Sequence, residues 1–194
     1  MEFTSMKRLL LIAALTMGAS ACVNGNEAIM ILGSTPVGPD CSQRTDLAPI
    51  TGSLQAGSDR FVTSFTIASS LPAKPSNSGE RNDFYGEEII FSYRAENQKP
   101  AISFDDESLP ISFFIQVGAA DSVLVLDLIA SGAKAKVPNL AEGSTLYVTV
   151  KLKGKTSGGT TVESNEATFP IRIVGSCVGS PSDGTGACAN PKQC

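Results

Sequence analysis

Histidine and tryptophan do not occur in this chain of 194 residues, and only 6% of its residues are aromatic. The first absence excludes imidazole as a general base or metal ligand. The second removes the largest aromatic ring that could stack on a sugar. The chain also has no cluster of basic residues that could neutralise several phosphates: the lysines nearest to one another are Lys151, Lys153 and Lys155, which alternate along what the pattern predicts to be the solvent face of a strand. The sequence thus lacks the basic surface that nucleic-acid binding requires.

Only one long apolar run is present, and it lies near the amino terminus. Lys7 and Arg8 precede nine residues, 9–17, that are apolar except for one threonine. This run is too short for a permanent membrane-spanning helix. A basic start followed by a short apolar core is typical of a secretory signal peptide. We predict that translation begins at Met6, because a start at Met1 would place Glu2 in an otherwise basic region.

The end of this leader, Ala19-Ser20-Ala21-Cys22, resembles the lipobox of bacterial lipoproteins. The resemblance implies cleavage before Cys22, acylation of that cysteine, and attachment to the membrane through its acyl chains. Val23 follows, whereas Asp in that place is the inner-membrane retention signal of the best-known sorting system, so we expect an outer-membrane location. An alternative is ordinary secretion, because Ala19-x-Ala21 also fits a signal peptidase that would cut the same bond.

The exported part, residues 22–194, is long enough for one domain with its own core. Without Glu2, Lys7 and Arg8 it has 13 basic and 18 acidic residues, of the 15 and 19 in the whole chain, and a net charge of −5. From Thr51 onward apolar residues recur with a period of two, which predicts strands with one buried face. The clearest strand has Leu146, Val148, Val150 and Leu152 on its inner face.

Seven strands of this kind are expected, separated by loops with Gly, Pro, Asn or Asp, and no stretch has a clear helical period. We therefore predict an all-β fold, an immunoglobulin-like β-sandwich. The predicted inner-face residues of the other patterned strands are Phe61, Thr63, Phe65 and Ile67; Ile89, Phe91, Tyr93 and Ala95; Ile111, Phe113, Ile115 and Val117; and Ala167, Phe169, Ile171 and Ile173. The predicted organisation is a signal peptide (1–21), a tether (22–48), the sandwich (49–175) and a disulfide-rich tail (176–194).

Four details of the strands are open to test. The apolar patch 28–32 either forms a peripheral strand on the domain or belongs to the tether. Residues 123–129 are apolar on both faces except for Asp127, which predicts a central or doubly covered strand. Pro170 cannot donate a ladder hydrogen bond and predicts an edge or a bulge in the last strand. Gly158-Gly159 predicts a tight hairpin, with the two long strands that flank it paired directly.

Acylation of Cys22 would leave an even set of cysteines, Cys41, Cys177, Cys188 and Cys194. In an exported domain such a set predicts two disulfides, for which three pairings exist. We favour Cys188 with Cys194 and Cys41 with Cys177, because the second bond would tie the start of the domain to its end. A zinc site is the alternative, but the spacings do not form the two close pairs that such sites usually have.

Four local patterns are candidate sites. Ser131-Gly132-Ala133-Lys134 matches the Ser-x-x-Lys motif of penicillin-binding proteins, but its partner motifs are missing and we interpret it as chance. The acidic residues Asp105, Asp106 and Glu107 are a candidate calcium loop, although a solvated turn explains them better. The exposed aromatic platform of a sugar-binding surface would have to come from Phe84, Tyr85 and Phe114. The loop 71–83 is a candidate binding loop.

Several features together resemble the lipoproteins that occur in large numbers in myxobacteria. These are the lipobox, the apolar patch from Ala28 to Gly33, Cys41 before the first strand, the Gly-rich hairpin with Glu163-Ser164-Asn165-Glu166, and the tail cysteines. The resemblance implies an exported lipoprotein with a β-sandwich and no assigned activity.

The sequence therefore favours a non-enzymatic, lipid-anchored envelope protein without a cofactor, which contacts an envelope or extracellular protein or glycan. A carbohydrate-binding or calcium-dependent adhesion module is the alternative. A hydrolase is least expected, because without histidine it would depend on Ser-Lys or on paired carboxylates.

Overall fold

The computed structural model describes residues 27–37, 52–73, 82–175 and 188–189. This part of the chain contains ten strands, one short α-helix and one 3₁₀ helix. The strands are β1 (Ile29–Pro36), β2 (Gly52–Gln55), β3 (Val62–Ser69), β4 (Phe84–Glu96), β5 (Glu107–Ile115), β6 (Ser122–Asp127), β7 (Thr145–Thr156), β8 (Thr161–Glu163), β9 (Ala167–Val174) and β10 (Cys188–Ala189). The helices are α2 (Ser131–Lys134) and η1 (Val137–Asn139).

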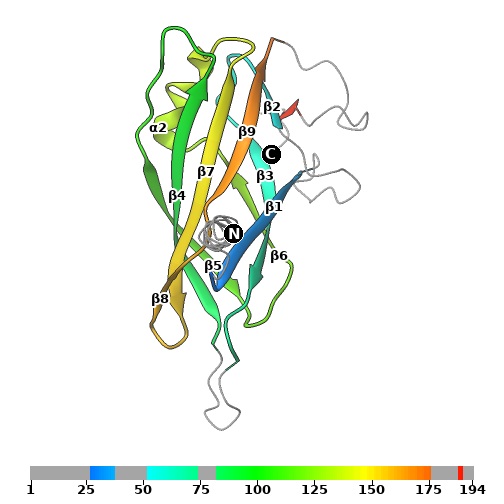
Figure 1. Cartoon of the computed structure of the whole chain (residues 1–194), viewed down its shortest axis with the longest axis vertical. Coiled ribbons are helices and arrows are strands. Elements are labelled where there is room, and N and C mark those ends of the chain that lie inside the picture. The colour runs from blue at the N-terminus through cyan, green and yellow to red at the C-terminus, as the bar shows by residue number, and fades with distance from the viewer. Residues whose placement is uncertain (1–26, 38–51, 74–81, 176–187, 190–194) are drawn as a thin grey trace, which may run out of the picture.

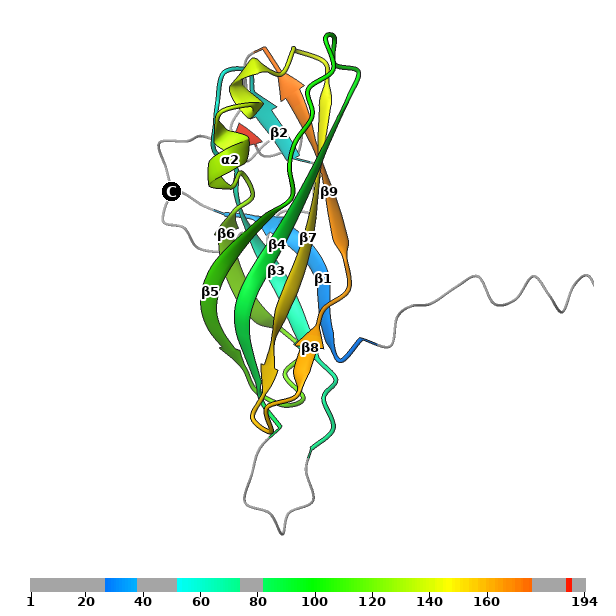
Figure 2. The ribbon, with the colours of Figure 1, turned by 90° about the vertical axis from the view of Figure 1, so that its left-hand side faces the viewer.

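The strands form two sheets that face each other, which confirms the prediction of an all-β sandwich (Figures 1 and 2). The small sheet has the strand order β1-β3-β6. The large sheet has the order β10-β2-β9-β7-β4-β5, and β8 pairs with β7. Most neighbours are antiparallel, but β2 runs parallel to both β9 and β10. The helices α2 and η1 lie at one end of the sandwich, in the connection from β6 to β7 (Figure 2).

The core lies between the sheets and is built by the residues whose period of two pointed inward. Leu146, Val148, Val150 and Leu152 are all buried. Phe65 from the small sheet and Phe169 from the large sheet meet edge to face with their ring centroids 4.9 Å apart. Side chains from both sheets thus interdigitate in one apolar layer, as two packed sheets require.

A bulge in β4 changes which residues of this strand point inward. The register with β5 and β7 shifts between Gly86 and Glu88. Phe84 and Gly86 are buried before the shift, whereas Ile89 and the alternate residues that follow it are buried after it. One extra residue in the strand reverses the alternation, so both halves of β4 bury their apolar side chains.

The apolar patch near the start of the described chain forms a strand of the sandwich, the first of the two alternatives that its sequence left open. Ile29 and Ile31 of β1 are buried, and β1 pairs with β3 with a bulge between Ile31 and Gly33. β1 thus extends the folded domain to residues that we expected in the tether.

The other edge of β1 is held by a side chain. The Ile31 N–H donates to Oδ1 of Asn165 at 2.6 Å, and Nδ2 of Asn165 donates to the Ile31 carbonyl oxygen at 3.1 Å. The neighbouring Ser164 is buried, and its hydroxyl accepts a hydrogen bond from the Leu152 N–H at 2.9 Å. Two residues of the three-residue link between β8 and β9 therefore bond to β7 of the large sheet and to β1 of the small sheet.

The hairpin prediction is confirmed, with a break at this link. The Thr156 N–H donates to the Thr160 carbonyl oxygen, and Gly159 has a φ of +81°, which favours glycine. Beyond the turn β7 pairs first with β8 and then with β9. The strand after the hairpin is thus interrupted by Ser164 and Asn165.

One prediction about strand positions needs correction, and a second is confirmed. β6 is not central: within the described residues it pairs only with β3, and Val123 and Val125 are 50% and 39% exposed. Its two apolar faces do not reflect two covered faces. Pro170 lies in the half of β9 that pairs only with β7, whereas Ile171–Val174 also pair with β2. The prediction of an edge at Pro170 is confirmed, because among the described residues β9 has only one neighbouring strand at this position.

The connection after β6 is anchored by one tyrosine. The hydroxyl of Tyr93 donates to the Leu128 carbonyl oxygen at 3.0 Å and accepts from the Ala130 N–H at 2.9 Å. Burial raises the pKa of the Tyr93 hydroxyl well above its ordinary value. This hydroxyl therefore serves as a neutral hydrogen-bonding group that fixes the start of α2.

Cys22, Cys41, Cys177 and Cys194 lie outside the described residues, and Cys188 begins β10. The acylation site and the two disulfides accordingly stay predictions. Neither helix in the described part of the chain has the length and apolar composition needed to cross a membrane.

The link between β8 and β9 leads to a stability prediction. Asn165→Ala should lower the free energy of unfolding by about 2 kcal/mol, because it leaves the N–H and the carbonyl of Ile31 without a partner. Thr168→Ala is the control: its hydroxyl bonds to Thr149 on the exposed face, and we expect a change within about 0.5 kcal/mol. Urea unfolding followed by circular dichroism measures both. Equal values for the two variants would show that Asn165 does not hold β1.

Candidate functional site

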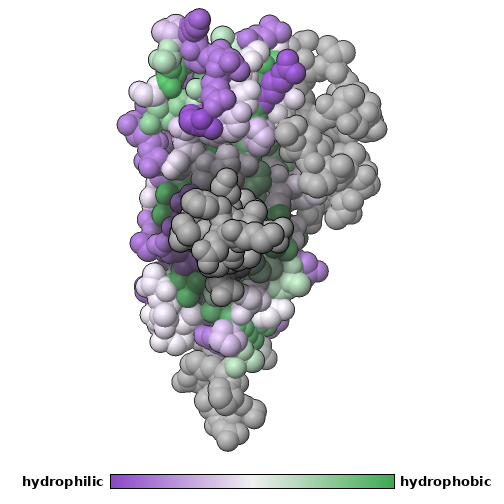
Figure 3. All heavy atoms as spheres, viewed as in Figure 1, coloured by the Kyte–Doolittle hydropathy of each residue, from purple (hydrophilic) through white to green (hydrophobic). Residues whose placement is uncertain are grey.

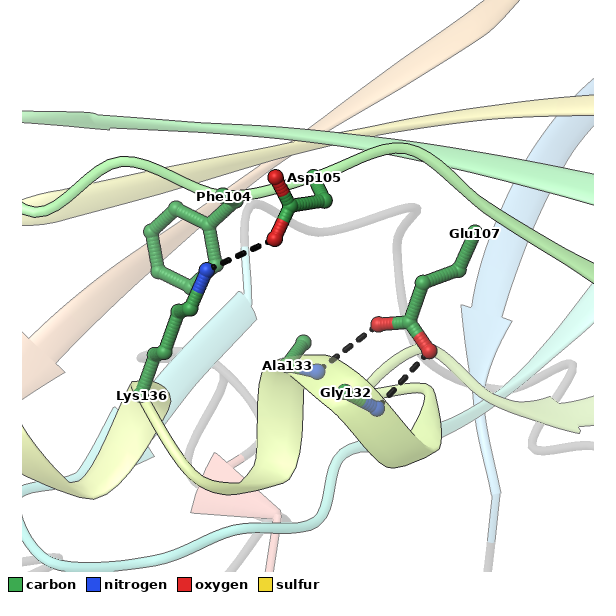
Figure 4. A pocket seen from close by; sticks show the side chains of 6 residues that line it. All are labelled: Phe104, Asp105, Glu107, Gly132, Ala133 and Lys136. Atoms are coloured by element: carbon green, nitrogen blue, oxygen red, sulfur yellow. Dashed lines mark hydrogen bonds and ion pairs between the residues drawn. The ribbon is translucent and has the colours of Figure 1, made fainter.

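Two motifs that lie apart in the sequence meet at one end of the sandwich. Glu107 begins β5, and its two carboxylate oxygens accept hydrogen bonds from the N–H groups of Gly132 and Ala133, each at 2.7 Å (Figure 4). The hydroxyl of Ser131 donates to the same carboxylate at 3.4 Å. The residue before α2, Ala130, has no side chain that caps the helix. Glu107 therefore supplies from another strand the acceptors that the first N–H groups of a helix require.

A small hollow lies beside this contact. Its lining residues are Phe104, Asp105, Glu107, Gly132, Ala133 and Lys136 (Figure 4). The ammonium group of Lys136 bonds to Asp105 at 3.0 Å and lies 5.9 Å from the ring centroid of Phe104. The hollow measures about 30 Å³, which is room for no more than a few water molecules. We interpret it as a packing feature of the connection.

The Ser-x-x-Lys motif does not form a catalytic pair. Ser131 bonds to Glu107, whereas the ammonium group of Lys134 pairs with Asp127 at 3.2 Å. Asp127 also accepts hydrogen bonds from the N–H groups of Phe61 and Ile129. Lys134 thus belongs to the contacts that close the end of β6, and nothing in the described geometry directs it to the Ser131 hydroxyl.

The acidic residues 105–107 separate into different environments. Asp105 pairs with Lys136, and Glu107 binds the amides of α2. Calcium binds six to eight oxygens. In residues 27–37, 52–73, 82–175 and 188–189, no group of three or more His, Cys, Asp or Glu side chains is arranged to hold a metal ion. The carboxylate of Asp105 accepts from a lysine, and that of Glu107 accepts from backbone amides.

The predicted aromatic platform is partly formed. Phe84 is fully buried against Phe113, so its inclusion was wrong. The reason is the bulge in β4, which turns Phe84 inward and Tyr85 outward. Tyr85 and Phe114 are paired across β4 and β5, are 46% and 48% exposed, and have ring centroids 5.4 Å apart. Two exposed aromatic rings therefore lie side by side where β4 begins.

Charged side chains continue this outer face of the large sheet. Lys155 lies opposite Tyr85 on β7 and pairs with Glu87 at 2.9 Å. Glu88 and Lys153 pair at 3.4 Å. A hydrogen bond from the Ser108 hydroxyl, together with Lys153, lowers the pKa of Glu88. This row is polar and almost neutral, with ion pairs next to the two rings.

A similar pair lies further along the same sheet. Lys151 and Glu163 pair at 2.5 Å, and their hydrogen bond lowers the pKa of Glu163 and raises that of Lys151. Figure 3 shows hydrophilic side chains gathered at the upper end of this face and along its β4 side, with apolar ones among them lower down. The large sheet thus presents mainly a solvated outer face.

The outer face of the small sheet has the opposite character. Asp127 is the only charged residue in β1, β3 and β6. Leu32, Val123 and Val125 are its exposed large apolar residues. Sequence reasoning missed this surface because it interpreted apolar residues on both faces of β6 as burial.

The loop 71–83 is described in part. The Asn82 side chain donates to the Pro72 carbonyl oxygen, and buried Asp83 accepts a hydrogen bond from the Val117 N–H at 2.9 Å. The described ends of the loop are thus bound to the body of the sandwich. A binding role for the loop stays a prediction.

Neither a scan against protein-family models nor a search of the curated proteins finds a match to this chain. Its function is therefore inferred from its leader and its surfaces.

The contact between Glu107 and α2 leads to the second prediction. Glu107→Ala should lower the free energy of unfolding by about 1 to 2 kcal/mol, because two helix N–H groups lose a charged acceptor. Asp105→Ala removes only an exposed ion pair, and we expect a change within about 0.5 kcal/mol. Thermal unfolding of the two variants provides the measurement. A loss on Asp105→Ala as large as that on Glu107→Ala would contradict the structural role of Glu107.

Proposed function

We propose that this chain is an exported, acylated envelope lipoprotein, anchored in the outer membrane, that acts by binding rather than by catalysis. The observation that carries the proposal is the leader from Met6 to Ala21, which ends in a lipobox-like sequence at Cys22. A short apolar core after two basic residues favours export. Acylation of Cys22 would then hold the folded part at the membrane surface.

We further propose that the sandwich is immunoglobulin-like. Strand order supports this assignment: β1 pairs with β3 in one sheet, and β9, β7 and β4 lie side by side in the other. In this assignment β3 and β6 correspond to strands B and E, and β4, β7 and β9 correspond to C, F and G. Such sandwiches commonly serve as recognition modules, although a fold by itself does not define a function.

The contacts of the charged residues support a binding role. Glu107 belongs to the acidic motif, and Asp127 lies shortly before the Ser-x-x-Lys motif. Both carboxylates accept hydrogen bonds from backbone N–H groups. Lys134 and Lys136 pair with carboxylates. A nucleophile needs an adjacent base that can accept its proton. The carboxylate that Ser131 contacts, that of Glu107, already accepts two hydrogen bonds from backbone N–H groups.

Replacement of the lipobox cysteine tests the anchor. The unsubstituted chain should fractionate with membranes and give an N-terminal peptide that begins at Cys22 and carries acyl chains in mass spectrometry. Cys22→Ser should remove the acyl mass and release the protein from the membrane, because the remaining exported part has no comparable apolar run. Val23→Asp is the matched control, which should stay acylated. An unmodified Cys22 in the native chain would refute the proposal.

A second candidate function is glycan binding by Tyr85 and Phe114. Their two exposed rings form an apolar surface, and the neighbouring Lys155 and Glu87 offer a hydrogen-bond donor and acceptors. Apolar rings next to polar groups are the arrangement that recognises the C–H faces and hydroxyls of a sugar. This observation favours carbohydrate binding over calcium-dependent adhesion.

A glycan microarray probed with the full chain tests this candidate. Tyr85→Ala and Phe114→Ala should each weaken binding to the recognised glycan about tenfold, because each removes one ring of the pair. Tyr147→Ala is the control, since Tyr147 lies on the same sheet under Arg94, with the guanidinium 4.7 Å from the ring centroid. An array without any signal, or an equal loss with Tyr147→Ala, would remove the candidate.

A further inference from the structure

The bulge in β4 places two consecutive glutamates on the outer face of the large sheet. The register with β5 and β7 shifts between Gly86 and Glu88, and Ile89 after the shift is buried. Glu87 and Glu88 therefore both point outward, close to Tyr85. Bulges often occur next to functional sites, where the extra residue redirects a side chain. This bulge brings two carboxylate groups next to the exposed aromatic rings.

Two glycines make this arrangement possible. Gly86 and Gly154 lie opposite each other on β4 and β7. A Cβ atom at Gly86 would lie 2.0 Å from a ring carbon of Phe113, and one at Gly154 would lie 2.0 Å from the carbonyl oxygen of Tyr85. A glycine within a strand commonly marks a bulge or the close approach of another backbone. The backbone that carries Tyr85 is thus packed closely against its neighbours.

The two aromatic rings belong to one row of residues across the sheet. Tyr85 pairs in register with Phe114 of β5 on one side and with Lys155 of β7 on the other, and Lys155 pairs with Thr161 of β8. Directly opposite residues point to the same face, and neighbouring strands are about 5 Å apart. In the part of the chain that the structure describes, β5 and β8 each pair with one strand only. The row therefore has four positions: two aromatic rings, a lysine and a threonine.

The tilt of the two rings determines how they can hold a sugar. Their centroids are 5.4 Å apart, and their planes meet at 51°. Rings inclined in this way cannot both lie flat against one side of the same sugar, whereas each can stack on a sugar unit of its own. A ligand that uses both rings therefore has at least two consecutive sugar units, which follow the row across the strands.

The charged groups next to the rings are balanced. Glu87 pairs with Lys155 at 2.9 Å, and Glu88 pairs with Lys153 at 3.4 Å. Glu88 also accepts a hydrogen bond from the Ser108 hydroxyl. Two lysines and two glutamates have no net charge together, so they offer donors and acceptors to hydroxyl groups without attracting an ion. An acidic sugar would have to displace the glutamates, since both lysines already have a carboxylate partner.

We propose that the row formed by Phe114, Tyr85, Lys155 and Thr161 binds an uncharged oligosaccharide of three or four β-linked pyranose units. The first unit stacks on Phe114 and the second on Tyr85, and hydroxyl groups of the third bond to Lys155 and Glu87. Units with equatorial hydroxyl groups, such as glucose and N-acetylglucosamine, fit this row, because their axial C–H groups give each unit two apolar faces. The inference rests on the second candidate function, glycan binding, and specifies the length, charge and direction of the glycan.

Oligomers of defined length test the inference. Cello-oligosaccharides and chito-oligosaccharides, which are β-linked chains of glucose and of N-acetylglucosamine, are titrated into the full chain in detergent by calorimetry. The affinity for at least one series should rise at least about tenfold from one unit to three, because each added unit gains a contact in the row. Beyond four units, where the row ends, it should change by less than about twofold.

Removal of the outer ring tests the order along the row. Phe114→Ala should lower the affinity for three units at least about fivefold and leave that for one unit within about twofold, because a single unit can use Tyr85 alone. The unfolding midpoint measured in the same samples controls for loss of structure. A purely structural role of Phe114 would weaken the binding of every length equally, which would contradict the proposed order.

The charge balance is tested with oligomers of β-linked glucuronic acid, the acidic counterpart of the glucose series. The native chain should bind them at least about tenfold more weakly than the neutral oligomers, and Glu87→Gln, which removes the carboxylate partner of Lys155, should raise their affinity at least about fivefold. Glu163→Gln is the matched control, because it removes the partner of Lys151 on the same sheet but outside the row. It should change neither affinity by more than about twofold.

The outcomes separate this inference from the proposed function. A neutral oligomer bound equally well at every length, or an acidic oligomer preferred to the neutral one, overturns the inference and leaves glycan binding in place. The same holds if the array identifies a glycan but no neutral β-linked oligomer binds. If neither the array nor any oligomer gives a signal, both the inference and the glycan candidate are overturned, whereas the lipid anchor is tested separately by the Cys22 variant.

Discussion

Asn165 accepts a hydrogen bond from the N–H of Ile31 and donates one to its carbonyl oxygen, so that one side chain takes the place of a neighbouring strand along β1. The residue before it, Ser164, holds the same segment to Leu152 of the large sheet. Two consecutive residues therefore connect the sheets at the margin of the core. Without this link, β1 would have an unsatisfied edge, and the apolar layer above Ile29 and Ile31 would open to water. The packing of the first strand depends on it.

The two outer faces of the sandwich follow from this construction. On the large sheet, lysines and glutamates on adjacent strands pair with one another, which keeps a broad surface solvated. The small sheet has no such pairs, and its only charge, Asp127, is used to close the end of β6. Within the described residues, the two outer faces therefore differ: the large sheet presents paired charges and the small sheet presents Leu32, Val123 and Val125.

The polar residues that first attract attention as chemical groups serve the fold. Glu107 binds the N-terminal amides of α2, Asp127 binds two backbone N–H groups, and Lys134 and Lys136 each pair with a carboxylate. A short helix and an irregular connection have few hydrogen bonds of their own, so side chains from other strands must satisfy them. These contacts explain how the Ser-x-x-Lys motif and the acidic loop come together at one end of the sandwich.

The sequence by itself determined the all-β class and the inner faces of most strands, because a period of two in apolar residues directly reports which side chains a sheet buries. It also identified Tyr85 and Phe114 as candidates for an exposed surface. Only the tertiary structure decided that Phe84 is buried, that β6 is an edge, and that Glu107 meets α2. A bulge reverses the alternation without changing the composition, and an apolar strand has the same sequence whether a neighbour covers it or not. Contacts between residues far apart in the chain depend on strand order and register, which local patterns do not encode.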